Sequence, residues 1–213
     1  MNQDSHPGAK AHASLREKVR GLVRDQILDA AAAIFAQDGL QAAKMEEIAS
    51  RAGVAVGTVY NYFADRQALL AAVMDERTRL LADRLKAIER TSRGQPFGER
   101  LEVFLRELLG FFDAQRALYS VLIQAECSPS HSNRIAWAHR DGPFSEIYRQ
   151  AERLIETGRR ERVLRDEEPG FLGAMLVGMV RTMAIRALLD AKTPTLSDRL
   201  RQISELFLRG ASR

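Results

Sequence analysis

The residues best suited to chemistry lie in the segment VGTVYNY, residues 56 to 62, where hydroxyl, amide and small side chains follow one another closely. Asparagine can pair with two edge atoms of adenine, and aromatic or methyl groups can contact the methyl of thymine. Threonine and tyrosine hydroxyls, and the backbone N–H groups at a helix N-terminus, can bind phosphate. Although the stretch from Ala52 to Ala64 carries no charge, this segment is therefore suited to reading DNA.

Basic residues that could bind the phosphates of DNA flank this segment. Residues 10 to 24 hold five lysines and arginines against Glu17 alone, and these cations would supply the salt-dependent part of DNA affinity. The basic residues expected at the interface are Arg20, Arg24, Lys44 and Arg66. Residues 1 to 66 as a whole contain eight basic and eight acidic residues, so the positive surface must be a local patch.

Two short helices are needed to position these groups, and the apolar spacing predicts them near residues 43 to 52 and 54 to 63. Gly53 lies between them, where glycine allows a positive φ. Val59 and Phe63, at i and i+4, are expected to anchor the second helix. The residues left facing outward are Val56, Gly57, Thr58, Tyr60, Asn61 and Tyr62. This pattern predicts a helix-turn-helix; the alternative is an ordinary buried helix of an α-bundle.

Helical spacing continues through the whole chain, which predicts an all-α fold of about nine helices. Ser14 and Glu17 fit a capping box, so a helix is expected from Ser14 to Gln37, with Gly39 as its stop. A long helix follows from 66 to 90, with Asp65 as its N-cap. After a break at 91 to 96, further helices are predicted near 97–113, 115–126, 132–159, 168–191 and 195–209, the third interrupted at 141–143.

The domain organisation expected from these elements has three parts. Residues 1–13 form a disordered basic arm, 14–66 a helix-turn-helix DNA-binding domain, and 67–213 a ligand-binding and dimerisation domain joined to it by the long helix. Of the 213 residues, 46% are apolar and 28% charged, as in soluble globular proteins. The uncharged run at 171–180 is too short to span a bilayer. We therefore expect a cytoplasmic protein with no membrane partner.

The sequence gives little support to the interpretation that the protein is an enzyme. The sequence has no GxSxG, HExxH or P-loop pattern. His131 and His139 lack a neighbouring ligand set, so no metal and no cofactor are expected. Cys127 is the single cysteine, which excludes an internal disulfide and favours a role as a small apolar filler.

The segment from Ile27 to Leu70 resembles the DNA-binding domain of the TetR family of transcriptional regulators. The resemblance rests on ILDAA, the F…G close of the first helix, MEEIA, AGV, GTVY and YF. It implies that Gly57, Thr58 and Tyr62 contact phosphate, that Tyr60 and Asn61 face bases, and that Arg66 replaces a phosphate-binding lysine. The chain departs from the pattern at Ala43, where threonine is common, and at Arg162, where a second glycine is frequent.

The resemblance also implies that the C-terminal half senses a small molecule and forms a homodimer. Large apolar residues of the middle helices could line a pocket, although core packing is the simpler interpretation for any one of them. The pocket candidates are Phe104, Leu108, Phe111, Phe112, Tyr119, Leu122, Trp137, Tyr148, Met175, Met179 and Met183. The candidates for the dimer interface, with an intrachain core as the alternative, are Gly173, Val177, Gly178, Leu200, Ile203 and Phe207.

The function expected is a ligand-responsive dimeric regulator. It is most simply a repressor that a small apolar or aromatic molecule releases from its operator. The operator is expected to be palindromic double-stranded DNA, because a dimer places two reading helices one DNA turn apart. The alternatives are an activator or a DNA-independent adaptor of the same fold, and more remotely an all-helical enzyme.

Overall fold

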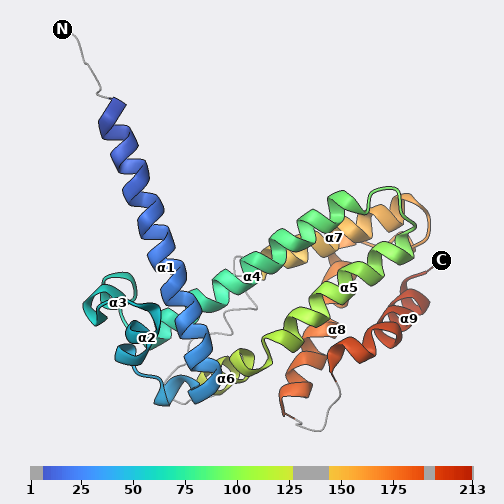
Figure 1. Cartoon of the computed structure of the whole chain (residues 1–213). Coiled ribbons are helices and arrows are strands. Elements are labelled where there is room, and N and C mark those ends of the chain that lie inside the picture. The colour runs from blue at the N-terminus through green and yellow to red at the C-terminus, as the bar shows by residue number, and fades with distance from the viewer. Residues whose placement is uncertain (1–6, 127–143, 190–194, 213) are drawn as a thin grey trace. The chain divides into compact units, whose positions relative to one another are not determined.

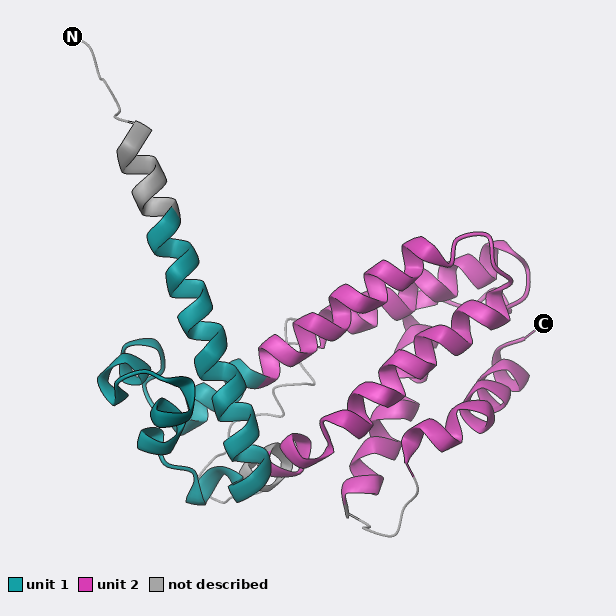
Figure 2. Cartoon of the chain, in the orientation of Figure 1, with its two compact units in different colours: residues 1–73 teal, residues 74–213 magenta. Residues whose placement is uncertain are grey.

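The computed structural model describes residues 7–126, 144–189 and 195–212, and in this part of the chain it contains nine α-helices and one short 3₁₀-helix (Figure 1). The all-α class is therefore confirmed. Cys127, His131, Trp137 and His139 lie outside the described residues, as does the predicted interruption at 141–143. The chain divides into two compact units, residues 1–73 and 74–213 (Figure 2), a boundary seven residues beyond the expected one.

The first unit contains α1 (Pro7–Ala42), α2 (Met45–Ala52), α3 (Val56–Tyr62) and the start of α4 (Arg66–Thr91). The expected start of the first helix at Ser14 is wrong, because α1 already begins at Pro7. The alanines at 9, 11 and 13 are strong helix formers, and a Ser-x-x-Glu pattern also fits a helix interior. The backbone leaves helical geometry at Gly39, with φ of 77°, so the predicted break there is confirmed.

One apolar core holds the first unit together. The side chains of α1 at helical spacing are buried, and each of the other helices of the unit contributes at least one buried residue. The core includes Ile27, Ala31, Ile34, Phe35, Ile48, Val59 and Leu69. The Asp65 carboxylate accepts a hydrogen bond from the Ala68 N–H at 2.8 Å, as expected of the N-cap of α4.

The second unit contains the rest of α4, α5 (Phe97–Ala114), α6 (Arg116–Glu126), α7 (Ser145–Arg160), α8 (Pro169–Leu189), η2 (Leu196–Arg199) and α9 (Leu200–Ala211). Here α7 and α8 pack along each other, and α5 contacts α7, α8 and α9. Gly173 makes the α7–α8 approach possible, because a Cβ there would lie 3.0 Å from the Glu152 backbone nitrogen.

A carboxylate fastens the C-terminal helices to α5. Asp113 accepts hydrogen bonds from the backbone N–H groups of Leu196 and Ser197, at 2.8 and 2.9 Å, and from the Ser197 hydroxyl at 2.6 Å. Leucine 196 itself is buried. The start of η2 is thus capped from another helix instead of by its own N-cap residue.

Helix α8 is longer than the uncharged run within it. By length and composition, residues 169–188 of α8 would suffice to cross a membrane. The uncharged run of ten residues within it, taken alone, is too short to do so. Such a helix is equally typical of a soluble core, and α8 is buried at Leu172, Leu176, Val177 and Val180. It also carries Arg181 and Arg186, so we regard it as a core helix of the second unit.

Candidate nucleic-acid interface

The turn between α2 and α3 is built by one left-handed residue. Gly53 has φ of 70° and ends α2, and the next N–H, that of Val54, donates to the carbonyl of Ala49 at 3.0 Å. This is the hydrogen-bond pattern of a glycine-terminated helix. Ala55 is extended, and α3 begins directly after it. The predicted helix-turn-helix is therefore present, with bounds within two residues of those expected.

Helix α3 has one buried face and one free face. Val59 is fully buried and Phe63, directly after the helix, is 6% exposed, so these two residues anchor α3 as predicted. On the opposite side Tyr60 is 50% exposed and Asn61 is also exposed. Val56 and Gly57 are exposed as well, whereas Thr58 and Tyr62 are half-buried. The free face is thus uncharged, with hydroxyl, amide and apolar groups side by side.

Two arginines of α1 lie against this helix and its end. The Arg20 guanidinium carbon is 5.7 Å from the centre of the Tyr62 ring, and that of Arg24 is 5.9 Å from the centre of the Phe63 ring. Both distances are typical of cation–π pairs. The two arginines also border a hollow of about 650 Å³ that reaches Asn61 and Tyr62. The tertiary structure therefore brings the predicted positive charge to α3.

Two residues expected to contact phosphate have protein partners in this structure. The Tyr62 hydroxyl donates to the carbonyl oxygen of Arg20 at 3.1 Å. Arg66 uses one terminal nitrogen to bind the carbonyls of Gln41 and Ala43, at 2.7 and 3.0 Å. Arg66 therefore closes the loop between α1 and α2, and only its other donors are left for DNA.

Lysine 44 occupies the N-cap position of α2. Its backbone is extended, and its side chain makes no capping hydrogen bond. The ammonium group lies 3.5 Å from the Glu47 carboxylate in an exposed pair, which is worth little in water. Ala43, the site of a departure from the family pattern, is completely buried. Lys44 is thus an exposed cation at the start of α2.

Four of the predicted pocket residues lie in the packed core of the second unit. Phe104, Leu108, Phe112 and Tyr119 are buried, and the rings of Phe112 and Tyr119 are 5.1 Å apart. Burial raises the pKa of the Tyr119 phenol far above its ordinary value, against a smaller opposing effect of the Thr78 hydroxyl. The half-buried candidates are Phe111, Tyr148, Met179 and Met183, whereas Met175 is exposed and the Leu122 side chain and Trp137 are not described.

The predicted interface residues are mostly turned inward. Val177, Ile203 and Phe207 are at most 4% exposed within a single chain, and Gly173 faces α7 instead of a partner. Gly178 and Leu200 are half-buried. The exposed apolar side chains on these helices are Phe171, Met175 and Leu206, at 54%, 48% and 66%. The more apolar face of each of these helices thus packs inside its own chain.

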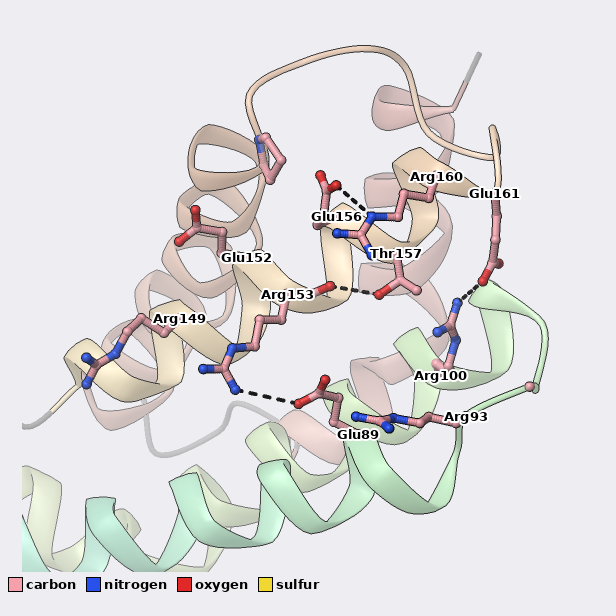
Figure 3. Close-up of a pocket in the computed structure, with 12 residues that line it drawn as sticks. Glu89, Arg93, Arg100, Arg149, Glu152, Arg153, Glu156, Thr157, Arg160 and Glu161 are labelled. Carbon is pink, nitrogen blue, oxygen red and sulfur yellow. Dashed lines mark hydrogen bonds and ion pairs between the residues drawn. The ribbon is translucent and has the colours of Figure 1, made fainter.

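A hollow that the sequence analysis missed lies between α4, α5 and α7 (Figure 3). Its volume is about 850 Å³, and charged side chains line most of it. Arg100 borders both this hollow and a smaller cavity of about 30 Å³ behind it. The one signal in the sequence is that Arg100 shares the helix face of Phe97 and Phe104, three residues after one and four before the other.

Comparison with known proteins agrees with this geometry. Residues 27–73 match the sequence profile described as "Bacterial regulatory proteins, tetR family". The fatty acid metabolism regulator protein of Bacillus subtilis is 34% identical over 61 residues, which are 29% of this chain and 31% of that protein. The transcriptional repressor KstR of Mycolicibacterium smegmatis is 45% identical over 51 residues, 24% of this chain and 25% of the repressor. The chain thus aligns with about a third of the length of these curated relatives, or less.

The similarity of fold extends further than that of sequence. The structure of the regulator FadR from Bacillus subtilis, solved in complex with stearoyl-CoA, covers 87% of this chain and 97% of its own, with a TM-score of 0.70 and 19% identity. The fold and the exposed α3 together define a protein with an N-terminal helix-turn-helix domain of the regulatory class. The N-terminal segment of the chain, residues 27–73, thus matches the TetR family of regulators.

Proposed function

We propose that this protein is a dimeric transcriptional repressor that binds a palindromic operator through α3 and leaves it when a small molecule binds the second unit. The observation that carries the proposal is the division of α3 into a buried and a free face. Val59 is fixed in the core, while Tyr60 and Asn61 face solvent. An amide and an aromatic ring on an exposed helix can read base edges in the major groove.

Phosphate binding falls to the cations around α3. Arg20 and Arg24 are held next to it by aromatic rings, and Lys44 is exposed at the start of α2. The Tyr62 hydroxyl and the unbound donors of Arg66 are further candidates, as are Thr58 and the backbone at Gly57. Such contacts set the position of a protein on the duplex, whereas base contacts select the sequence.

Dimerisation is proposed to use α8 and α9 through the side chains that the single chain leaves exposed. Phe171 and Met175, four residues apart, share one face of α8, and Leu206 extends from α9. Exposed apolar side chains on two packed helices are typical of a subunit interface. A twofold pair of α8–α9 surfaces would give each half of a palindrome its own α3.

The effector is proposed to bind within the second unit and to act on DNA binding through α4. The boundary between the units, after Val73, falls inside this helix, so a displacement of α4 is passed along a continuous backbone. Stearoyl-CoA bound to the regulator from Bacillus subtilis favours an effector with a large apolar part. Linkage requires that DNA weaken effector binding by the same factor as the effector weakens DNA binding.

A cytoplasmic location follows from this function, because the operator lies on the chromosome. An activator of the same fold would bind the same kind of site. A DNA-independent adaptor would not bind a duplex at all. If the protein is a repressor, the protein–DNA complex should dissociate when the effector is added. If it is an activator, the complex should form or persist.

The experiment begins with selection of bound duplexes from a random library by the wild-type protein. The affinity for the selected site and for a scrambled duplex is then measured at fixed salt. Tyr60→Ala and Asn61→Ala are expected to lose about 1–3 kcal/mol of preference for the selected site. Gln37→Ala, an exposed change farther along α1, is the control. Unchanged affinity and preference in both α3 variants would contradict the proposal.

A further inference from the structure

The small cavity of about 30 Å³ that adjoins the hollow between α4, α5 and α7 is bordered by two buried polar atoms that have no partner among the described residues. Arg100 is 8% exposed and Gln150 is 3% exposed. The Nε atom of Arg100 and the Oε1 atom of Gln150 are both shielded from solvent and make no hydrogen bond. An unpaired buried donor or acceptor is unfavourable, so two such groups at one cavity indicate that something else satisfies them.

The orientation of both groups is determined by their other contacts. Gln150 donates through Nε2 to the Glu146 carboxylate at 2.7 Å, and because a carboxylate only accepts, the amide oxygen of Gln150 must point the other way. Arg100 contacts Glu161 through one terminal nitrogen, which leaves its Nε–H group free. Both residues border the cavity of about 30 Å³, which has room for about two water-sized groups.

The outer part of the hollow adds a cation without a partner. Arg93, at the end of α4, has no ion pair or hydrogen bond among the described residues, while Arg153 on α7 reaches toward it and Glu89 (Figure 3). The Arg153–Glu89 pair is long, at 3.9 Å, and both side chains are more than a third exposed. Such a pair is weak in water, so an anionic ligand could displace Glu89 from Arg153 at little cost.

We propose that this hollow binds the polar end of the effector, an organic anion whose carboxylate or phosphate pairs with Arg93 and Arg153. A neighbouring oxygen of the ligand accepts from Arg100 Nε, and a hydroxyl donates to Gln150 Oε1. The inference deepens the proposed function, since it names the chemical class of the effector. It also explains why an arginine occupies position 100 on the apolar face of α5, where an aliphatic side chain would pack without needing a hydrogen-bond partner.

The test follows the Nε–H signal of Arg100 in ¹⁵N-labelled full-length protein without DNA. The probes are sodium octanoate and sodium pyrophosphate, with sodium chloride at matched ionic strength, so that a carboxylate head is distinguished from a phosphate head. We expect one of the two anions to shift the Arg100 signal saturably and to raise the unfolding temperature. Arg93→Gln is expected to weaken that binding about tenfold, the effect of one lost ion pair in a partly dry site.

Two further variants distinguish a site that binds an anionic ligand from polar groups that serve only the structure. Arg90→Gln removes the same charge from an exposed position of α4 that does not border the hollow, so it should bind as the wild type does. Gln150→Leu removes the unpaired acceptor together with the hydrogen bond to Glu146, and it should weaken anion binding when measured on protein that thermal denaturation shows to be folded. Equal binding by wild type and Arg93→Gln, or no saturable shift with either anion, would overturn the inference and indicate that water alone satisfies Arg100 and Gln150.

The outcome is independent of the proposed function as a whole. The titration is read on free protein, so it decides the anion site whether or not an operator is bound. Failure of the wild-type protein to select any duplex would refute the DNA-binding proposal instead. Saturable anion binding that also lowers operator affinity would support both together.

Discussion

The Tyr62 hydroxyl donates a hydrogen bond to the backbone carbonyl of Arg20 at 3.1 Å, and the guanidinium of the same arginine lies 5.7 Å from the Tyr62 ring centre. One residue of α3 therefore binds both the backbone and the side chain of one residue of α1. The contact fixes α1 against the end of α3 and holds a positive charge beside the proposed base-reading face. A helix without charge thus gains a cation from a segment forty-two residues away.

The first prediction concerns this cation. Arg20→Gln should reduce the slope of log affinity against log salt concentration by about 0.9, the value for one lost phosphate contact on duplex DNA. The measurement is operator binding at four or more salt concentrations. Arg90→Gln, with the same loss of charge in the second unit, should leave the slope unchanged. An unaltered slope for Arg20→Gln would show that Arg20 serves only to hold Tyr62.

The two glycines of the helix-turn-helix should respond in opposite directions. Gly53→Ala should lower the free energy of unfolding by about 1 kcal/mol, because the φ of 70° disfavours any side chain. Gly57→Ala should raise it by roughly 0.5 to 1 kcal/mol, since this glycine is helical with open space around it. The same Gly57→Ala change should weaken operator binding, because the added methyl lies on the exposed face. Chemical denaturation measures the first two effects.

Arginine 162 is a position where the protein should gain stability. It is the non-glycine residue with a positive φ, 59°, in the described part of the chain, and it lies two residues after the end of α7, where the family often has glycine. Arg162→Gly should stabilise the protein by roughly 0.5 to 1 kcal/mol, the left-handed penalty less the added entropy of the unfolded chain. Arg160→Gly, inside the last turn of α7, should instead destabilise it. Thermal denaturation distinguishes the two, and equal losses would contradict the strain argument.

Acid should weaken the second unit partly through Glu146. Burial acts to raise the pKa of this carboxyl, but the hydrogen bond from Gln150 and the nearby Lys86 and Arg149 outweigh it, so the pKa lies below its ordinary value of 4.5. A lowered folded-state pKa gives stability that is complete above the ordinary value and is lost as the pH falls through the lower one. Glu146→Gln should therefore show a shallower loss of unfolding free energy in acid. An unchanged acid profile would contradict this.

The proposed dimer face can be tested with one charge. Leu206→Glu should convert the dimer to monomers in sedimentation experiments, because an exposed apolar side chain at a subunit contact becomes a buried, unpaired charge. Leu15→Glu changes another exposed leucine, 59% accessible on α1, and should leave the assembly intact. Dimers of the Leu206→Glu protein at low micromolar concentration would exclude α9 from the interface.

The helix-turn-helix was predictable from the sequence, because everything that defines it is local. Gly53 ends one helix through its own φ, Val59 and Phe63 fall on one face through i, i+4 spacing, and Tyr60 and Asn61 between them then face outward. Asp65 caps α4 through a bond to an N–H three residues away. None of these features depends on what packs against them, so residue type and spacing were sufficient.

The sequence by itself determined which residues α3 presents and that the chain is all-helical, whereas the tertiary structure decided what those residues meet. Periodicity shows that a helix has an apolar face but not which partner covers it, and only the structure shows that Ile203 and Phe207 are buried within their own chain. A charged residue is ordinarily solvated, so only packing could reveal that Arg100 is buried beside Gln150. Contacts between distant segments, such as Tyr62 with Arg20, arise from chain folding and leave no local spacing to detect.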